Sequence, residues 1–75
     1  MAASPPYKCY DDDGVYQAST KDSTLAAAIM ACLPEGARVK FHGRVVWVEG
    51  RDGCAADSYD NAALVMDQRI EENQP

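Results

Sequence analysis

The residues of this 75-residue chain that could do acid–base chemistry are few, and their spacing matches no catalytic motif. The single histidine, His42, lies in Phe41-His42-Gly43, where we expect a solvent-exposed turn between two strands. A catalytic histidine must lie within hydrogen-bond reach of its nucleophile and be oriented by a third group. A turn tip is a poor place to hold that geometry, so we predict that the protein is not an enzyme.

The cysteines Cys9, Cys32 and Cys54 are widely spaced. Structural zinc ligands usually come in close pairs such as C-x₂-C, and an odd number of cysteines does not read as a disulfide framework. Free thiols suit a reducing cytoplasm. We therefore predict no structural zinc and no cofactor.

Three consecutive aspartates, Asp11 to Asp13, precede Gly14. A calcium loop needs alternating oxygen ligands over about 12 residues and a closing glutamate, and this run leads into a valine instead. We predict a turn here, with a weak cation site or an acidic contact surface as the alternative.

Composition restricts the class of protein further. Hydrophobic residues make up 47% of the chain, which indicates a folded domain rather than a disordered one. Twelve acidic and seven basic residues give a net charge of −5, which disfavours free nucleic acid as a ligand and suits a basic protein partner. The chain has neither a long apolar run nor a signal-peptide pattern, so we expect a cytoplasmic protein that contacts no membrane.

Turn and cap signals divide the chain into a flexible leader over 1–6, one domain over 7–72 and a frayed tail over 73–75. The domain has six expected elements: strands over 7–10 and 15–18, a helix over 22–33, strands over 38–41 and 44–48, and a helix from Asp57 or Ser58 to 72. The register of the first hairpin stays open between a two-residue and a four-residue turn. The order predicts an α+β fold, ββαββα, with a four-stranded antiparallel sheet and two helices on one face.

The second hairpin presents the first group of candidate binding residues. A two-residue turn at His42-Gly43 pairs Val39 with Val46 and Arg38 with Trp47, so Val39, Phe41, Val46 and Val48 face the core. Trp47 then lies on the solvent side with Arg38 and Lys40, and tryptophan and arginine are enriched at interface hot spots. We predict that Arg38, Lys40 and Trp47 contact a partner. The alternatives are a local cation–π pair, or a shift of one residue that buries Trp47.

The first helix is apolar nearly all round, which a small monomer cannot cover on both sides. We assign Leu25, Ala28, Ile29 and Cys32 to the core. Ala27 and Met30, on the opposite side, are then predicted to contact a partner or a second copy, which gives a homodimer through residues 25–33. The alternative is that the alanines are simply exposed.

The last helix presents the third group. Its core stripe comprises Tyr59, Ala62, Ala63, Met66 and Ile70, at helical spacing. The outer face carries Asp60, Leu64, Asp67 and Glu71, an apolar residue among acids, which we predict to meet a basic groove. The alternative is an ordinary solvated face with one exposed leucine.

In overall character the chain resembles the small, acidic, cofactor-free α+β proteins that bacteriophages encode to disable host machinery, such as anti-CRISPR proteins and inhibitors of host polymerase. The features that carry this resemblance are the short length, the Asp11–Asp13 run, the Asp60–Asp67–Glu71 face and the lack of a catalytic constellation. It implies an inhibitor that binds a larger nucleic-acid-processing or defence protein in the cytoplasm of a host cell.

Two other functions stay open. One is a self-assembling accessory protein. The other is an oligomeric binder of small nucleotides, with a pocket between chains lined by Arg38, Lys40, Arg44 and Trp47.

Overall fold

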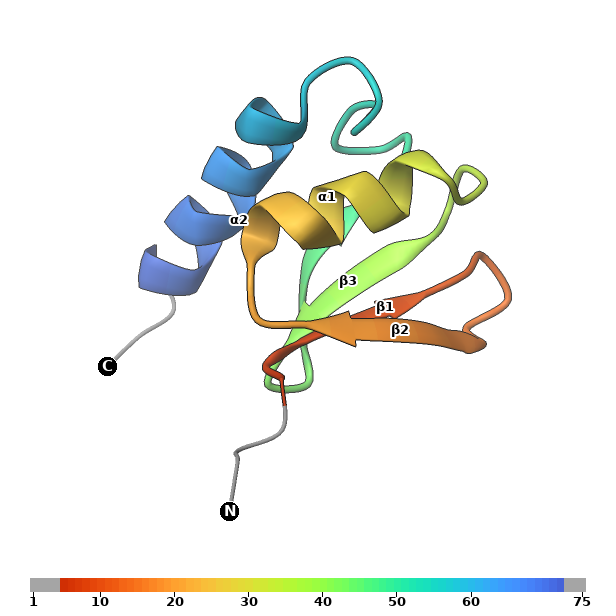
Figure 1. The fold of residues 1–75 in the computed structure, drawn as a ribbon, viewed down its shortest axis with the longest axis horizontal. Coiled ribbons are helices and arrows are strands. Elements are labelled where there is room, and N and C mark those ends of the chain that lie inside the picture. Colours follow the sequence, from red (N-terminus) through yellow and green to blue (C-terminus); the bar gives the residue numbers. More distant parts are fainter. Residues whose placement is uncertain (1–4, 73–75) are drawn as a thin grey trace.

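A computed structural model describes residues 5–72 of the chain, and the predicted tail and most of the predicted leader lie outside them. The chain runs through two hairpin-plus-helix units (Figure 1). The elements are β1 (Tyr7–Tyr10), β2 (Tyr16–Thr20), α1 (Ser23–Ala31), β3 (Arg38–Phe41), β4 (Arg44–Val48) and α2 (Tyr59–Glu72). No helix in this described part is long and apolar enough to cross a membrane.

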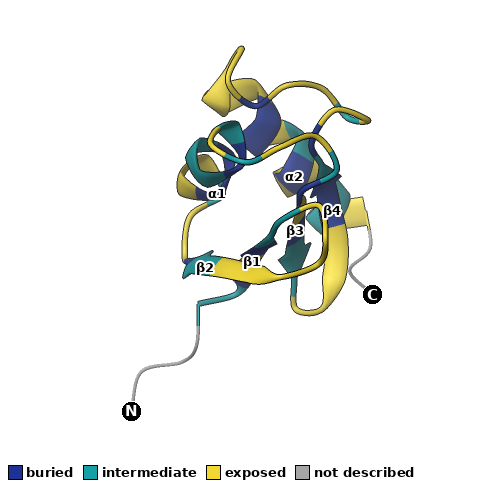
Figure 2. Ribbon diagram, turned by 90° about the vertical axis from the view of Figure 1, so that its right-hand side faces the viewer, coloured by how far each residue is buried: buried dark blue, intermediate teal, exposed yellow. Residues whose placement is uncertain are grey.

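The strands form one antiparallel sheet in the order β2-β1-β3-β4, so the inner strands of the two units pair with each other. Both helices lie on one face of this sheet, where α1 packs over β1 and β2, and α2 packs against α1 and β4 (Figures 1 and 2). The predicted α+β fold and the ββαββα order are confirmed.

The first hairpin is closed by Asp11. Its carboxylate accepts hydrogen bonds from the backbone N–H groups of Asp13 and Val15, at 2.9 and 2.8 Å. Gly14 takes the positive φ of 83° that the turn requires. A bulge then shifts the register, because Cys9 pairs with Ala18 while Tyr10 pairs with Tyr16. The second strand covers 16–20 rather than the predicted 15–18.

Helix α1 is shorter than the predicted 22–33 and is turned the other way. Asp22 caps it by accepting the N–H of Thr24 at 2.7 Å, and Cys32 ends it. Ala27 and Met30 are fully buried, whereas Leu25 is 56% exposed, so the predicted partner contacts at Ala27 and Met30 are wrong. Small side chains let the helix backbone approach the sheet and α2 closely, and the flexible methionine fills the space beside them.

The second hairpin has the predicted His42-Gly43 turn, but its register changes within β4. Lys40 pairs with Val45 and Val39 pairs with Trp47, so Val46 is the extra residue of a bulge. Val46 and Trp47 are consequently both buried, and Trp47 is only 2% exposed. The prediction that Trp47 lies on the solvent side of the sheet is wrong.

Two carboxylates hold the loop between β4 and α2. Glu49 is buried and accepts the indole N–H of Trp47 at 3.0 Å and the N–H of Ala55 at 3.2 Å. Asp52 accepts the N–H of Val48 at 2.7 Å and two N–H groups of Arg69 at 2.8 and 3.0 Å. The loop is thereby attached to both the sheet and α2. Around it the buried residues of the two units form one core (Figure 2).

Candidate binding surfaces

The sheet face away from the helices carries a grid of exposed and half-buried side chains. Tyr7 and Cys9 point into the core, so the alternation of the strand places Lys8 and Tyr10 on this open face. The strand pairing then sets the neighbours in two rows across the sheet. The first row is Ser19–Lys8–Lys40–Val45, and the second is Tyr16–Tyr10–Arg38–Val48.

Positive charge is concentrated at the centre of this grid. Lys8 and Lys40 are direct cross-strand neighbours, and Arg38 lies on the same face two residues before Lys40. Like charges directly opposite each other destabilise a sheet. Within residues 5–72, no carboxylate lies within ion-pair distance of Lys8, Arg38 or Lys40.

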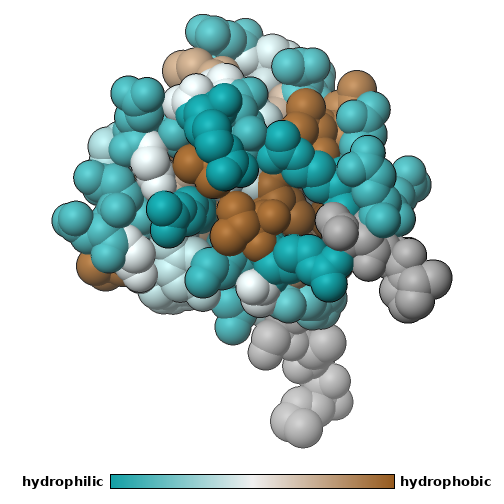
Figure 3. All heavy atoms as spheres, turned by 180° about the vertical axis from the view of Figure 1, so that it is seen from behind, coloured by the Kyte–Doolittle hydropathy of each residue, from teal (hydrophilic) through white to brown (hydrophobic). Residues whose placement is uncertain are grey.

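Aromatic rings lie beside these cations. The Lys40 ammonium lies 5.0 Å from the centroid of the Tyr10 ring, and the Tyr10 and Tyr16 rings meet edge to face at 6.0 Å. The cation–π pair on this face joins Lys40 to Tyr10 and not to Trp47, which is buried, so the alternative expected for Trp47 is wrong. On β4 this face carries the apolar residues Val45 and Val48. In the view from behind, apolar side chains gather in the middle of the molecule and hydrophilic ones surround them (Figure 3).

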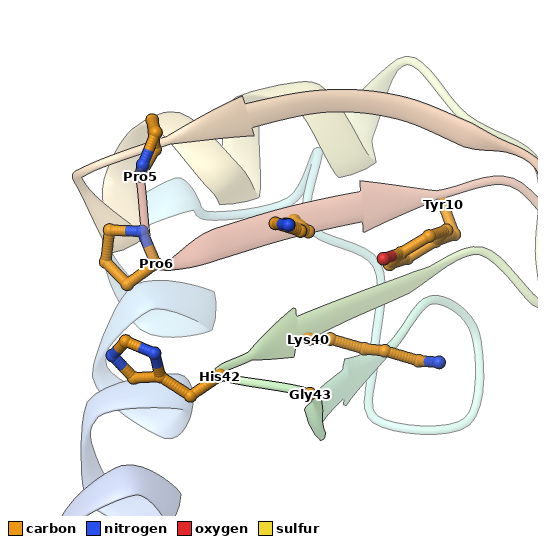
Figure 4. Close-up of a pocket in the computed structure, with 7 residues that line it drawn as sticks. Pro5, Pro6, Tyr10, Lys40, His42 and Gly43 are labelled. Atoms are coloured by element: carbon orange, nitrogen blue, oxygen red, sulfur yellow. The ribbon is translucent and has the colours of Figure 1, made fainter. Parts of the chain in front are cut away.

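A hollow of about 460 Å³ opens at one end of the grid (Figure 4), and Lys8 is one of the residues that line it. Pro5, Pro6 and His42 lie on one side of it and Tyr10 and Lys40 on the other. The N–H of His42 donates to the Pro6 carbonyl at 3.3 Å, which ties the start of the described chain to the β3–β4 turn. His42 itself has a φ of 50°, in the region that few residues other than glycine adopt.

The outer face of α2 is a second surface, and its exposure agrees with the prediction. Asp60, Leu64, Asp67 and Glu71 recur at helical spacing along one side and are all exposed, with Leu64 at 55%. The Asp67 carboxylate also accepts hydrogen bonds from the hydroxyl groups of Tyr7 and Ser23, both at 3.4 Å. Burial first, and then the Asp67 charge, raise the pKa of the Tyr7 hydroxyl.

The outer side of α1 is a third surface, which sequence reasoning assigned to the core. A shallow apolar hollow runs between α1 and the end of β2, lined by Thr20, Leu25, Ala28, Ile29, Cys32 and Leu33. No signal in the sequence separates this side from the other, because apolar residues occupy nearly every position of the helix.

The remaining reactive groups are structural or dispersed. Cys9 is fully buried, and burial raises the pKa of its thiol to about 11, which disfavours the reactive thiolate. Cys32 and Cys54 are exposed. The carboxylates of Asp11, Asp12 and Asp13 lie within 4.8 Å of one another, and that of Asp11 already accepts the hydrogen bonds of its own turn.

The nine predicted contact residues thus divide among several places. Arg38 and Lys40 lie on the open sheet face, and four residues lie on α2. The other three, Trp47, Ala27 and Met30, are in the core. No protein-family model, curated protein or solved structure matches this chain. Its function is therefore inferred from these surfaces.

Proposed function

We propose that the protein is a binding module that inhibits a larger protein by covering a basic surface with the outer face of α2. The observation that carries the proposal is the exposure of Leu64 in the middle of the acidic residues Asp60, Asp67 and Glu71. An apolar contact ringed by charges of one sign fits an interface whose centre is dry and whose rim is polar. The charges steer the encounter with a basic partner, and Leu64 supplies the apolar contact.

The resemblance to acidic phage-encoded inhibitors points to the kind of partner. A surface that handles nucleic acid is basic, and an acidic helix face competes there for the same charges that draw phosphates. The protein then works in the cytoplasm of a host cell, where the exposed thiols of Cys32 and Cys54 stay reduced. It performs no catalysis and needs no cofactor for this role.

Affinity capture from a bacterial lysate with the tagged protein tests the proposal through matched variants. D60K/E71K reverses two charges of the α2 face. D12K/D13K makes the same change of net charge at the exposed first turn. Asp67 is left intact because its contacts with Tyr7 and Ser23 would confuse binding with folding.

We expect one protein to be retained by the wild type and by D12K/D13K, to be lost with D60K/E71K and L64S, and to elute as salt rises. Retention of the same protein by D60K/E71K and L64S would exclude the α2 face as the inhibitory surface. Loss with both charge variants alike would show that only net charge matters.

A second candidate is self-assembly, which the apolar hollow on the outer side of α1 favours. The dimer proposed here differs from the sequence-based expectation, because it uses Leu25 and Ile29 rather than Ala27 and Met30. Light scattering across a concentration series distinguishes the two candidates. A dimer that L25E converts to a monomer supports self-assembly, and a monomer at every concentration rules it out.

A further inference from the structure

The open face of the sheet carries three cations, and the one contact that the structure gives to their charges is that of Lys40 with the Tyr10 ring, within residues 5–72. Lys8 faces Lys40 across the β1–β3 pair, an arrangement that weakens the sheet, and Arg38 adds a third cation on the same face. No carboxylate among the described residues compensates any of the three. An anion placed between Lys8 and Lys40 would remove the repulsion and gain two charge-assisted hydrogen bonds.

The hollow that Lys8 and Lys40 line limits the size and shape of such an anion. Its volume of about 460 Å³ falls within the range of small-molecule sites, roughly 300 to 1,000 Å³. Its walls include the rings of Pro5, Pro6 and His42 on one side and the ring of Tyr10 on the other (Figure 4). A ligand with a phosphate and a planar ring system matches both the charges and the walls.

The surroundings of the grid argue against a long polyanion. The acidic turn Asp11–Asp13 directly follows Tyr10, so a strand extended along the second row would meet like charge. The net charge of the chain is −5, which also repels a long nucleic acid. A mononucleotide in the hollow would contact Lys8 and Lys40 without extending to that turn.

From these observations we infer that the open sheet face binds a small phosphorylated ligand of nucleotide size, with its phosphate between Lys8 and Lys40. The site lies within one chain, whereas the nucleotide pocket expected from the sequence lay between chains and included Trp47. It is separate from the α2 face, so either surface can bind without the other.

The experiment titrates the full chain with each of four probes and monitors the backbone amide signals by NMR. The probes are adenosine 5′-monophosphate, inorganic phosphate, adenosine and a ten-nucleotide oligothymidylate. We expect saturable shifts at Lys8, Tyr10, Lys40 and His42 with the nucleotide, weaker binding of phosphate at the same amides, and none of adenosine. Tighter binding of the oligonucleotide, with displacement of the nucleotide, would overturn the assignment in favour of a nucleic-acid strand.

Two variants make the test specific. K8E replaces the opposed lysines by an opposite-charge pair, so the urea midpoint should rise while nucleotide affinity falls about tenfold or more. K21A/R51A removes two exposed cations elsewhere and should leave the affinity unchanged. Equal binding by K8E and the wild type, or the absence of saturable binding by every phosphate probe, would overturn the inference.

Discussion

Single carboxylates decide how the second half of the chain is held together. Glu49 and Asp52 are three residues apart and both have low exposure, yet they satisfy different partners. Glu49 accepts hydrogen bonds from the buried indole of Trp47 and from the backbone of the loop, whereas Asp52 links the end of β4 to Arg69 on α2. Because a buried polar group without a partner costs more than a hydrogen bond gains, each carboxylate has a separable effect on stability.

The substitution E49A should lower the free energy of unfolding by about 1 to 3 kcal/mol, since it leaves the Trp47 and Ala55 N–H groups buried without an acceptor. Urea unfolding followed by the fluorescence of Trp47, the single tryptophan, measures the change directly. E71A, on the exposed side of α2, is the control and should change stability by less than about 0.5 kcal/mol. Equal stability of E49A and E71A would show that Glu49 does not support the tryptophan.

Asp52 should make the free energy of unfolding depend measurably on pH in the acid range. The hydrogen bonds from Arg69, together with those from the Val48 N–H and Arg51, lower the pKa of its carboxyl from 3.8 to about 2. The unfolded chain therefore binds the proton more tightly, so this stabilisation is fully present above 3.8 and is lost as the pH falls towards 2. It amounts to about 1 to 2 kcal/mol, because solvent reaches Arg69 and screens the pair.

Urea midpoints at about pH 6 and about pH 3 check this dependence. D52N should be less stable than the wild type at the higher pH. It should also lose less stability than the wild type when the pH is lowered from the higher to the lower value. The control D12N changes an exposed carboxylate in the first turn and should keep the wild-type slope. A wild-type slope in D52N would show that other groups cause the acid sensitivity.

At the scale of the elements, the sequence predicts the order of strands and helices but not which way two of them face. Turn residues and caps mark the element ends, so the predicted and observed bounds agree within two residues at every end. The bulge at Val46 adds one residue to β4 and reverses the facing of both Trp47 and Val48, so that Trp47 enters the core and Val48 lies on the open face. Strict alternation cannot foresee this change. In α1, apolar residues lie on all sides of the helix, so tertiary packing decides which side is buried. The buried side is the one that carries Ala27 and Met30.

The same uncertainty left the candidate sites only partly predictable. Exposed charges at regular spacing on α2 and at Arg38 and Lys40 could be read from the pattern. The cross-strand position of Lys8 opposite Lys40 could not be read from the pattern, because it depends on the pairing of β1 with β3, which are far apart in the sequence. Long-range strand pairing is set by the whole fold rather than by local residues.

Paired substitutions on α1 test its facing. M30A should cost about 2 to 4 kcal/mol, because it opens a cavity between the sheet and the helices. L25A removes an exposed side chain and should change the free energy of unfolding by about 0.5 kcal/mol or less. Urea unfolding of the two variants gives the comparison, and a larger loss for L25A than for M30A would mean that the helix is turned the other way.

At the scale of the whole molecule, the two ββα units share a single core. Their inner strands β1 and β3 form the middle of the sheet, and α1 packs against α2. The core joins Ala27 and Met30 of the first unit to Val46, Trp47 and Met66 of the second. A chain of this length buries only about 60% of its surface on folding, so neither half has apolar area to spare.

We therefore predict that the halves 1–36 and 37–75, made separately, do not fold. In the first half, Ala27 and Met30 would lose the strand and helix that cover them, and the β1–β2 hairpin would expose the edge that pairs with β3. An isolated two-stranded hairpin is marginal in water at best. Far-ultraviolet circular dichroism should show little ordered structure and no cooperative melting in either half, in contrast to the full chain. A cooperative transition in one half alone would mean that this unit has a core of its own and that the shared core joins two domains rather than making one.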